Sequence, residues 1–496
     1  YKEWKIDVLP MKPAPFKLEV IKQTGKQFAT VKTQIHRKDV NEIIIATDAG
    51  REGELVARLI LEKAGSKKPI KRLWISSVTD KAIREGFAKL KNGHEYDALY
   101  DAAMCRAEAD WLVGINATRA LTCKYNAQLS CGRVQTPTLA MIAKREEKIR
   151  SFIPEGYYGM TAKGQNIMLT WQDQKSKSYR SFDKEKMTGL MKKLDGQKAV
   201  VEEIKKTPKK TYAPLLYDLT ELQREANQRF GYSAKETLNI MQRLYENHKV
   251  LTYPRTDSRY LSKDIVPTIK DRLEACGTGP YRKLAMTAKK KDLSGKLAFV
   301  NDAKVSDHHA IIPTEQFVDL SHMTNEERKI YDLVVRRFLA VLYPPFEYEQ
   351  TQVTVKVGGE TFLASGKIVK AQGWRAAYEE EVYSAEDEEE EEAYESGKSL
   401  KGQTLPELEK GQEIKGLVLS LTEGKTKPPA HFNEATLLSA MENPTAYMES
   451  HDKAMAKTLG ETGGLGTVAT RADIIEKLFK SFLLEKRGKD IYLTSK

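Results

Sequence analysis

A tyrosine and an arginine lie two positions apart in the stretch TYPRTDS, residues 252–258. Pro254 restricts the backbone between them, and Arg255 carries a permanent charge. A tyrosine hydroxyl has an ordinary pKa of about 10, so Tyr253 is a poor nucleophile unless a cation stabilises its oxyanion or the phosphate that it attacks. Arg255 could hold that phosphate. The stretch is interpreted as a phosphate site that contains a nucleophile.

A pair of histidines follows in the stretch SDHHAIIPT, residues 306–314. His308 or His309 could donate a hydrogen bond to a phosphate or relay a proton. By itself such a pair is more often structural, and partners for metal ligation are not evident nearby in the sequence. We therefore treat the pair together with Tyr253 as one candidate site.

A cluster of carboxylates lies in the stretch DAGREGE, residues 48–54. Asp48 follows an apolar run that predicts a strand, while Glu52 and Glu54 fall in the first turn of a predicted helix. Ligands of α/β sheets bind at the carboxyl ends of the strands, and clustered carboxylates there suit Mg²⁺. On spacing alone the favoured alternative is an N-cap aspartate followed by two glutamates that suit the helix dipole.

The stretch SCGRVQTP, residues 130–137, combines backbone freedom with polar side chains. Gly132 allows close approach of a ligand, Arg133 offers a fork for phosphate, and Gln135 can bond a sugar or a base edge. Just upstream, Trp111 and Arg119 fall on one face of a predicted helix and join a stacking ring to a cation. The alternative is an ordinary loop before a capped helix, with Trp111 buried.

Composition narrows the class of partner. The 496 residues are too many for one core and predict about two to four domains. Eleven of the 69 acidic residues lie in residues 379–395, which leaves 58 acids against 81 Lys and Arg, a balance of +23 elsewhere. So basic a body, with 40% hydrophobic residues, suits a polyanionic partner, although an unspecialised basic surface has the same composition.

Several classes of protein are disfavoured by what the sequence lacks. The four cysteines form no C-x-x-C pair, so neither a zinc ribbon nor a disulfide framework is predicted, and a reducing cytoplasm fits. The sequence contains no apolar run of membrane-spanning length, no signal peptide and no P-loop, so ATP hydrolysis is not expected. The chain starts at Tyr1 without a methionine, and both ends are expected to be cut.

The elements that position these motifs are predicted from periodicity. Residues 17–65 are typical of helix, strand, turn and helix; a second strand at RLWIS and a cap within residues 77–80 indicate α/β structure with a parallel sheet. Residues 101–150 are helical with a break. Alternating patterns within 156–213, 348–370 and 412–422 predict strands around a helical insert, 219–340, and the acidic run is predicted to be a solvated, disordered loop.

Eight motifs occur together in an order that resembles the type IA DNA topoisomerases, and their wording is most similar to the bacterial topoisomerase III branch. The resemblance covers nearly the whole chain. The motifs are ATDAGREGE, INATRALT, SCGRVQTP, LYDLTELQREA, TYPRTDS, DHHAIIPT, FNEATLLSAME and GLGTVATRADII.

This resemblance implies an α/β and α+β multidomain fold, a toroid of four domains. The implied parts are an N-terminally truncated Toprim domain (1–105), a helical base (106–155 and 429–496), a β-rich gate (156–218 and 341–428, with the acidic loop 379–395) and a helical domain that bears the tyrosine (219–340).

The resemblance also implies roles for individual residues. Tyr253 would attack single-stranded DNA and form a 5′-phosphotyrosyl link, Arg255 would grip the phosphate, and His308 matches the active-site histidine of the family. Asp48 and Glu52 would bind Mg²⁺. The residues implied to contact DNA are Ser130, Cys131, Gly132, Arg133, Val134, Gln135, Arg119, Trp111 and Trp4.

The implied activity is ATP-independent strand passage that relaxes negatively supercoiled DNA and decatenates DNA, by a monomer in the bacterial cytoplasm, associated with the nucleoid and without a membrane partner. Two departures bear on it. Gly50 stands where many members have a second aspartate. The sequence from Tyr1 onward lacks the family's first Toprim strand with its acidic residue. The alternative is therefore a non-catalytic fragment that binds single strands; a Toprim nuclease or primase would not need the tyrosine motif.

Overall fold

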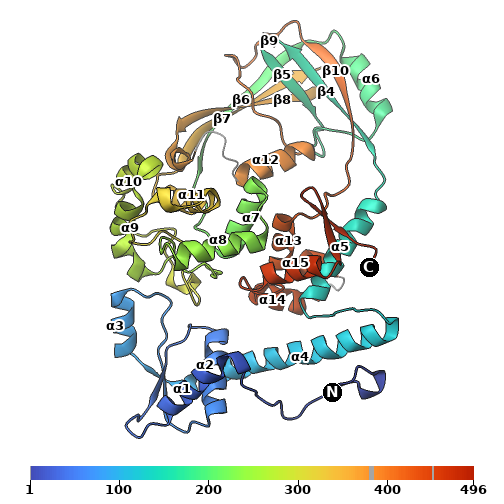
Figure 1. Cartoon of the computed structure of the whole chain (residues 1–496). Coiled ribbons are helices and arrows are strands. Elements are labelled where there is room, and N and C mark those ends of the chain that lie inside the picture. Colours follow the sequence, from blue (N-terminus) through green and yellow to red (C-terminus); the bar gives the residue numbers. More distant parts are fainter. Residues whose placement is uncertain (1, 379–384, 449–451) are drawn as a thin grey trace. The chain divides into compact units, whose positions relative to one another are not determined.

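The computed structural model describes residues 2–378, 385–448 and 452–496. The chain divides into two compact units, each assembled from separated stretches of sequence (Figure 1). Unit 1 comprises Tyr1–Glu146, Leu215–Phe338 and His431–Lys496, and unit 2 comprises Glu147–Pro214 and Leu339–Ala430.

Unit 1 begins with a small α/β part. Strand β1 pairs in parallel with β2, as predicted, and β3 adds to β2 in the antiparallel sense. The second strand ends earlier than the predicted RLWIS, because only one further backbone bond, from Leu73 N to Ile45 O, follows Arg72. The elements are α1 (Gly25–Ile35), β1 (Ile43–Ile45), α2 (Arg51–Ala64), β2 (Ile70–Arg72), α3 (Asp80–Ala88) and β3 (Lys91–Asn92).

Two helices follow the α/β part. Helix α4 (Asp97–Tyr125) is 29 residues long and ends at Asn126, whose φ of 47° is left-handed and stops the helix. Helix α5 (Gln135–Arg150) starts after the stretch SCGRV. The predicted break in an otherwise helical region is therefore confirmed, and SCGRV is the connection between two helices.

The rest of unit 1 is mainly helical. The side chains of α5, α7, α8, α13, α15 and the β11–β12 hairpin share one buried apolar core that includes Met141, Leu238, Leu438 and Ile475. The elements are α7 (Leu219–Phe230), α8 (Ala234–Glu246), α9 (Ile269–Cys276), α10 (Arg282–Ala288), α11 (Asn325–Ala340), α13 (Glu434–Glu442), α14 (Lys453–Glu461), α15 (Arg471–Lys480), β11 (Leu484–Arg487) and β12 (Asp490–Leu493).

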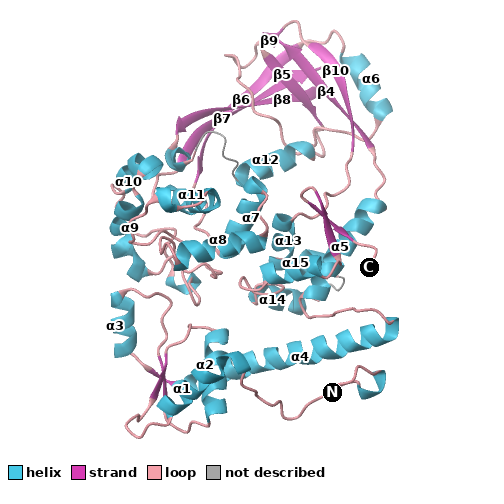
Figure 2. Cartoon of the chain, in the orientation of Figure 1, coloured by secondary structure: helices cyan, strands magenta, loops and turns pink. Residues whose placement is uncertain are grey.

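Unit 2 is built on a curved antiparallel sheet of seven strands in the order β10-β4-β5-β8-β7-β6-β9 (Figure 2). The two separated β regions predicted from sequence thus join in one sheet. The elements are β4 (Gly156–Gly164), β5 (Ile167–Gln172), α6 (Lys184–Leu194), β6 (Ala199–Thr211), β7 (Phe346–Val357), β8 (Glu360–Ala371), α12 (Ala385–Glu395), β9 (Glu413–Ile414) and β10 (Val418–Lys425).

Helix α6 was not predicted, although its signal is present. Met187 and Leu194 are seven residues apart, lie on one helical face and are buried in the core of the sheet. Asp183 caps the helix by accepting a hydrogen bond from Lys186 N at 2.9 Å. The apolar periodicity of this segment is helical even though strands flank it on both sides.

The prediction of a disordered loop for the acidic run is wrong for residues 385–395, which form helix α12; residues 379–384 lie outside the described part. Glutamate and alanine are good helix formers, and nearby cations reduce the repulsion between like charges. Arg375 pairs with Glu386 at 3.2 Å, and Lys367 pairs with Glu390 at 3.4 Å. Residues 385–395 are therefore a structured acidic part of unit 2.

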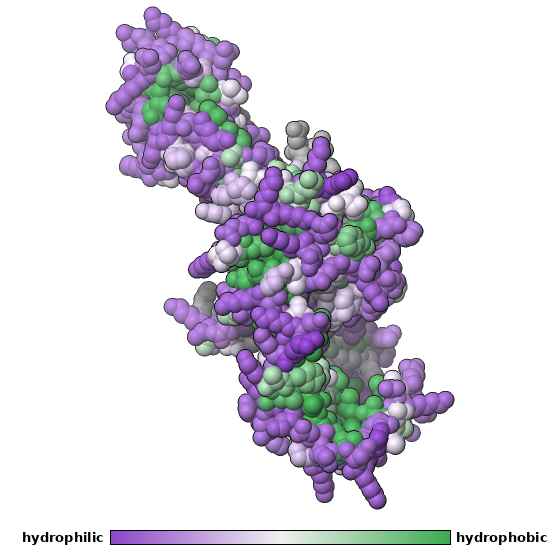
Figure 3. All heavy atoms as spheres, turned by 90° about the vertical axis from the view of Figure 1, so that its left-hand side faces the viewer, coloured by the Kyte–Doolittle hydropathy of each residue, from purple (hydrophilic) through white to green (hydrophobic). Residues whose placement is uncertain are grey.

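The surface is strongly polar over the face in Figure 3, where hydrophilic side chains cover most of the view. Within residues 2–378, 385–448 and 452–496, no helix has the length and apolar character needed to cross a membrane.

Candidate active site

The segments that carry Tyr253 and His308 run side by side. Thr252 N donates to Ile312 O at 3.0 Å, and Ile312 N donates to Thr252 Oγ1 at 3.0 Å. These bonds join two motifs that lie far apart in the sequence. The fold therefore builds one site from TYPRTDS and SDHHAIIPT.

The turn after Tyr253 is fixed by buried hydroxyl groups. Thr256 Oγ1 donates to His308 O at 3.1 Å, and Ser258 Oγ donates to Lys304 O at 2.7 Å. Thr256 N also donates to Pro254 O at 3.0 Å, which closes the turn. Both hydroxyl side chains are buried, so the bonds hold the tyrosine segment against the histidine segment.

Tyr253 lies between two aromatic rings. Its ring is 5.4 Å from that of Tyr245 on α8, nearly perpendicular to it, and 4.2 Å from that of His308. Over the described residues, the Tyr253 hydroxyl has no hydrogen-bond partner, and the Arg255 guanidinium has neither a hydrogen bond nor an ion pair. The scaffold is bonded while the two groups suited to chemistry are unengaged.

Asp48 reaches this site from the α/β part. Its Oδ2 lies 3.4 Å from His308 Nε2. The guanidinium of Arg72 fixes the backbone at Asp48: its Nη2 donates to Asp48 O at 2.6 Å, and its Nη1 donates to Thr47 O at 2.8 Å. Arg72 is fully buried and pairs with Glu54 at 2.7 Å. A buried ion pair therefore orients the loop that presents Asp48.

The two glutamates of DAGREGE have different surroundings. Glu54 is fully buried and divides its carboxylate between Arg72 at 2.7 Å and Arg58 at 3.0 Å. Glu52 is exposed and pairs with Arg106 at 3.2 Å. Glu54 is thus committed to the scaffold, whereas Glu52 remains accessible to a ligand.

The carboxylates accessible to a metal ion are few. Across the described ranges, no three Asp, Glu, His or Cys side chains gather closely enough to form a metal cage. Mg²⁺ commonly uses one or two carboxylates together with water and substrate phosphates. Asp48 and Glu52, both exposed oxygen donors at the start of α2, fit a site of that open kind.

His309 has a structural environment. Its Nδ1 lies 2.7 Å from Ala310 O, and burial lowers the pKa of its imidazole to about 4. The ring is therefore neutral at pH 7, with Nδ1–H as the donor to this carbonyl. Of the histidine pair, His308 is the one that contacts Tyr253.

Two residues of this site carry no signal that we recognised in the sequence. The carboxylate of Asp307 packs directly against Gly50 in the loop before α2. Asp264 accepts hydrogen bonds from Ser77 Oγ and from Thr79 Oγ1, the latter at 2.8 Å. Both contacts join the α/β part to the tyrosine-bearing part. The only available hint was Gly50, a glycine within an acidic motif.

The stretch Ser130–Gln135 is anchored along α4. Thr118 Oγ1 donates to Cys131 O at 3.1 Å and accepts from Cys131 N at 2.9 Å. Gln135 Nε2 donates to Ser130 Oγ at 2.6 Å, and Val134 packs against the core of unit 1. Gly132 N donates to a neighbouring threonine hydroxyl at 3.0 Å. The stretch is an ordered connection with a partly exposed outer edge.

Arg133 is engaged with a carboxylate within the protein. Its Nε and Nη2 donate to the two oxygens of Asp110, the second at 3.1 Å, and this pairing raises the pKa of the guanidinium. Both side chains are exposed. A phosphate would have to compete with Asp110 for the same fork.

Trp111 and Arg119 on α4 belong to two separate groups, the second of which includes Trp4 from the N-terminal segment. Trp111 is 39% exposed and meets the edge of Phe16 at 5.3 Å. Arg119 is buried, and the half-exposed ring of Trp4 covers it at 5.2 Å. The rings of Trp111 and Trp4 are thus accessible, whereas Arg119 supports Trp4 from beneath.

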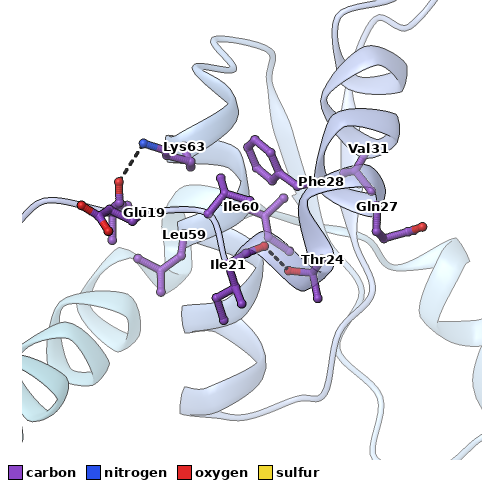
Figure 4. Close-up of a pocket in the computed structure, with 11 residues that line it drawn as sticks. Glu19, Ile21, Thr24, Gln27, Phe28, Val31, Leu59, Ile60 and Lys63 are labelled. Carbon is purple, nitrogen blue, oxygen red and sulfur yellow. Dashed lines mark hydrogen bonds between the residues drawn. The ribbon is translucent and has the colours of Figure 1, made fainter.

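A pocket lies elsewhere in the α/β part, between α1, α2 and the segment before them (Figure 4). Its volume is about 330 Å³, and its lining is mostly apolar, with Phe28, Leu59 and Ile60 among the residues. Lys63 at its rim donates to Leu18 O at 2.7 Å. None of the predicted site residues lines this pocket, so it is separate from the tyrosine site.

Comparison with known families gives two matches. The family model described as DNA topoisomerase matches residues 94–496, and the model of the Toprim domain matches residues 5–78. Together they span both the α/β part and the tyrosine-bearing part.

Related proteins agree with these matches. The chain is 62% identical to DNA topoisomerase 3 of Bacillus subtilis and 61% identical to that of Bacillus licheniformis. Each alignment covers 100% of this chain and 67% of the relative. The structure of full-length topoisomerase I from Thermotoga maritima matches 96% of this chain and 72% of its own, with a TM-score of 0.67 and 24% identity. That likeness shows the fold and confirms the predicted α/β and α+β multidomain class.

Proposed function

This chain belongs to the type IA DNA topoisomerases, isomerases that act on DNA, and we propose that Tyr253 is its nucleophile. The observation that carries the proposal is that, among the described residues, the hydroxyl of Tyr253 and the guanidinium of Arg255 two positions later have no partners, in a segment whose Thr256 and Ser258 hydroxyls are bonded. Such groups are available to a substrate.

The proposed reaction is an exchange of phosphodiester bonds. Tyr253 Oη attacks phosphorus in single-stranded DNA, the P–O3′ bond breaks, and a 5′-phosphotyrosyl link and a 3′-hydroxyl result. The phenol loses one proton and the departing oxygen gains one, so no net proton is consumed. The phosphotyrosine diester keeps the bond energy, and the 3′-hydroxyl reverses the step without ATP.

Three side chains assist Tyr253 in this proposal. Arg255 holds the scissile phosphate and stabilises charge in the transition state. His308, whose ring lies 4.2 Å from that of Tyr253, orients the tyrosine and relays a proton. Asp48, 3.4 Å from His308, fixes the position of the imidazole.

Toprim domains of topoisomerases generally bind metal ions, and we infer Mg²⁺ as the ion here. Asp48 and Glu52 would hold it, and when bound it would supply positive charge to a DNA phosphate. Glu54 does not take part, because its carboxylate is buried between two arginines.

The DNA path proposed for unit 1 follows α4. Trp111 on α4 and Trp4 in the N-terminal segment offer exposed faces on which unpaired bases can stack, and the connection after α4, Ser130–Gln135, is bonded to α4 through Thr118. Stacking needs exposed bases, so single strands, as found in negatively supercoiled DNA, are the preferred form. We further propose that the protein acts as a monomer and that 156–218 with 341–428 form the gate.

Trapping of the covalent adduct tests the proposal. A DNA oligonucleotide labelled at either end is incubated with the protein and denatured. Label on the 3′ side of the break should remain with the protein, label on the 5′ side should not, and Tyr253→Phe should abolish the adduct while strand binding persists. Binding without any adduct would instead support the alternative of a non-catalytic single-strand binder.

A further inference from the structure

Gly50 precedes helix α2, and its backbone does not explain why the residue is a glycine. Its φ of −167° and ψ of 179° are extended values that any residue can adopt. An aspartate, serine or asparagine here would cap the helix, yet α2 has no side-chain cap of its own. The reason for the glycine must therefore lie in packing.

The carboxylate of Asp307 fills the place of a side chain at residue 50. The three heavy atoms nearest to a Cβ built on Gly50 are Oδ2, Oδ1 and Cγ of Asp307, and all three would overlap it. A glycine is the residue that admits this approach. Asp307 comes from the segment of His308, far away in the sequence.

The position of this carboxylate has a physical consequence. The amino end of a helix carries partial positive charge, which favours a carboxylate placed beside it, and within the described residues this contact is made by packing without a hydrogen bond to the amides of α2. Asp307 is covalently next to His308, which lies 3.4 Å from Asp48 and 4.2 Å from the ring of Tyr253. Holding Asp307 at the start of α2 therefore holds the imidazole between the two loops.

We propose that Asp307 is a positioning residue for the cleavage reaction: its carboxylate packs against the start of α2 from another segment and so holds His308 between Asp48 and Tyr253. Residue 50 is a glycine because a side chain there would overlap the carboxylate of Asp307. This inference rests on the proposed role of Tyr253 and adds a residue that acts through His308 without touching DNA.

A double-mutant cycle tests the contact. Gly50→Ala should displace Asp307 and lower kcat for cleavage of an oligonucleotide by about 10²-fold, with little change in KM, since misplacement by about 1 Å can cost that much. Asp307→Ala should lower kcat by about 10-fold, and adding Gly50→Ala to it should cause no further loss, because the overlap is gone. Asp307→Asn keeps the bulk, so Gly50→Ala should remain harmful in that background.

A swap of the carboxylate gives the sharper result. In the double variant Asp307→Ala with Gly50→Asp, the carboxylate at the start of α2 is supplied by residue 50 itself, and kcat should recover to within about 3-fold of the original protein. A kcat for the Gly50→Ala variant equal to that of the original protein would overturn the proposal. So would an equal loss of kcat on adding Gly50→Ala to the original protein and to the Asp307→Ala variant.

Asp264 provides the matched control. It joins the same two parts through Ser77 and Thr79, away from Gly50. Asp264→Ala should therefore have effects that add to those of Gly50→Ala. Hydrogen exchange gives a readout independent of cleavage: amides at the start of α2 should exchange faster in Asp307→Ala than in the original protein. Unchanged exchange rejects the packing of Asp307 on the start of α2, whereas a lack of adduct in the original protein rejects the role of Tyr253.

Discussion

The tyrosine site and the surface along α4 both combine aromatic rings with arginines, but the arginines have different partners. This α4 surface comprises Trp4, Trp111, Arg119 and Arg133. At the tyrosine site Arg255 has no partner within the described residues. On the α4 surface Arg133 is held by Asp110 and Arg119 is buried beneath Trp4. An unengaged charge can act on a substrate at once, whereas a paired charge must first exchange partners. The comparison indicates chemistry at the first site and adjustable binding at the second.

The largest expected effect comes from removing Arg72, the buried arginine that orients the Asp48 loop at the tyrosine site. Arg72→Leu should destabilise the α/β part by about 3–5 kcal/mol, because it leaves Glu54 buried with Arg58 as its remaining cation. Denaturant-induced unfolding, monitored by hydrogen exchange in α2, would measure the loss of stability. Arg37→Ala, which removes an exposed pair with Asp39, is the control and should change stability by less than about 1 kcal/mol.

The next largest effect is expected at Arg255. Arg255→Ala should lower the rate of adduct formation by about 10²-fold, because a phosphate loses its cation in the transition state. Arg255→Lys should recover part of the rate, since it restores charge without the planar fork. Single-turnover cleavage measures both. A rate for the alanine variant near that of the original protein would place the phosphate elsewhere.

A smaller effect, on stability, should come from Asp218 beneath the tyrosine turn, where the adjacent Leu219 N donates to Thr256 O at 3.0 Å. Burial raises the pKa of Asp218 to about 6, above its ordinary value, although Arg259 nearby opposes the shift. The folded state thus binds the proton more tightly, and the contribution of Asp218 to stability is lost as pH rises from about 4 to 6.

Asp218→Asn keeps a capping side chain and removes this titration. The variant should be more stable than the original protein by about 1 kcal/mol at pH 7.5, with the difference shrinking toward pH 4.5. Thermal unfolding at both pH values measures it. A difference independent of pH would show that Asp218 does not titrate in this range.

The smallest expected effect sharpens the comparison at the α4 surface. Asp110→Asn should release Arg133 and tighten binding of a single-stranded oligonucleotide by about 2- to 3-fold, with a steeper dependence on salt. Arg133→Ala should weaken binding and reduce the slope of log affinity against log salt by about 1. Fluorescence anisotropy at several salt concentrations measures both slopes. Equal slopes in the two variants would exclude Arg133 from the DNA path.

The sequence by itself determined the main elements and the family. The periodicity around DAGREGE predicted β1 and α2, the break at SCGRV was placed between two helices, and the ordered motifs indicated the type IA topoisomerases. These predictions succeed because backbone periodicity and turn chemistry are local properties of the chain. Helix α6 and the acidic helix α12 were missed, since flanking strands and a run of like charges suggested other structures.

Only the tertiary structure decided which charges are available. DAGREGE contains two glutamates that look equivalent in sequence, yet Glu54 is buried against Arg72 while Glu52 is exposed. Likewise, the contact of Asp307 with Gly50 joins residues distant in the chain. Burial and pairing depend on segments that meet only when the chain folds, because desolvation and Coulomb interactions act through space and leave no local pattern.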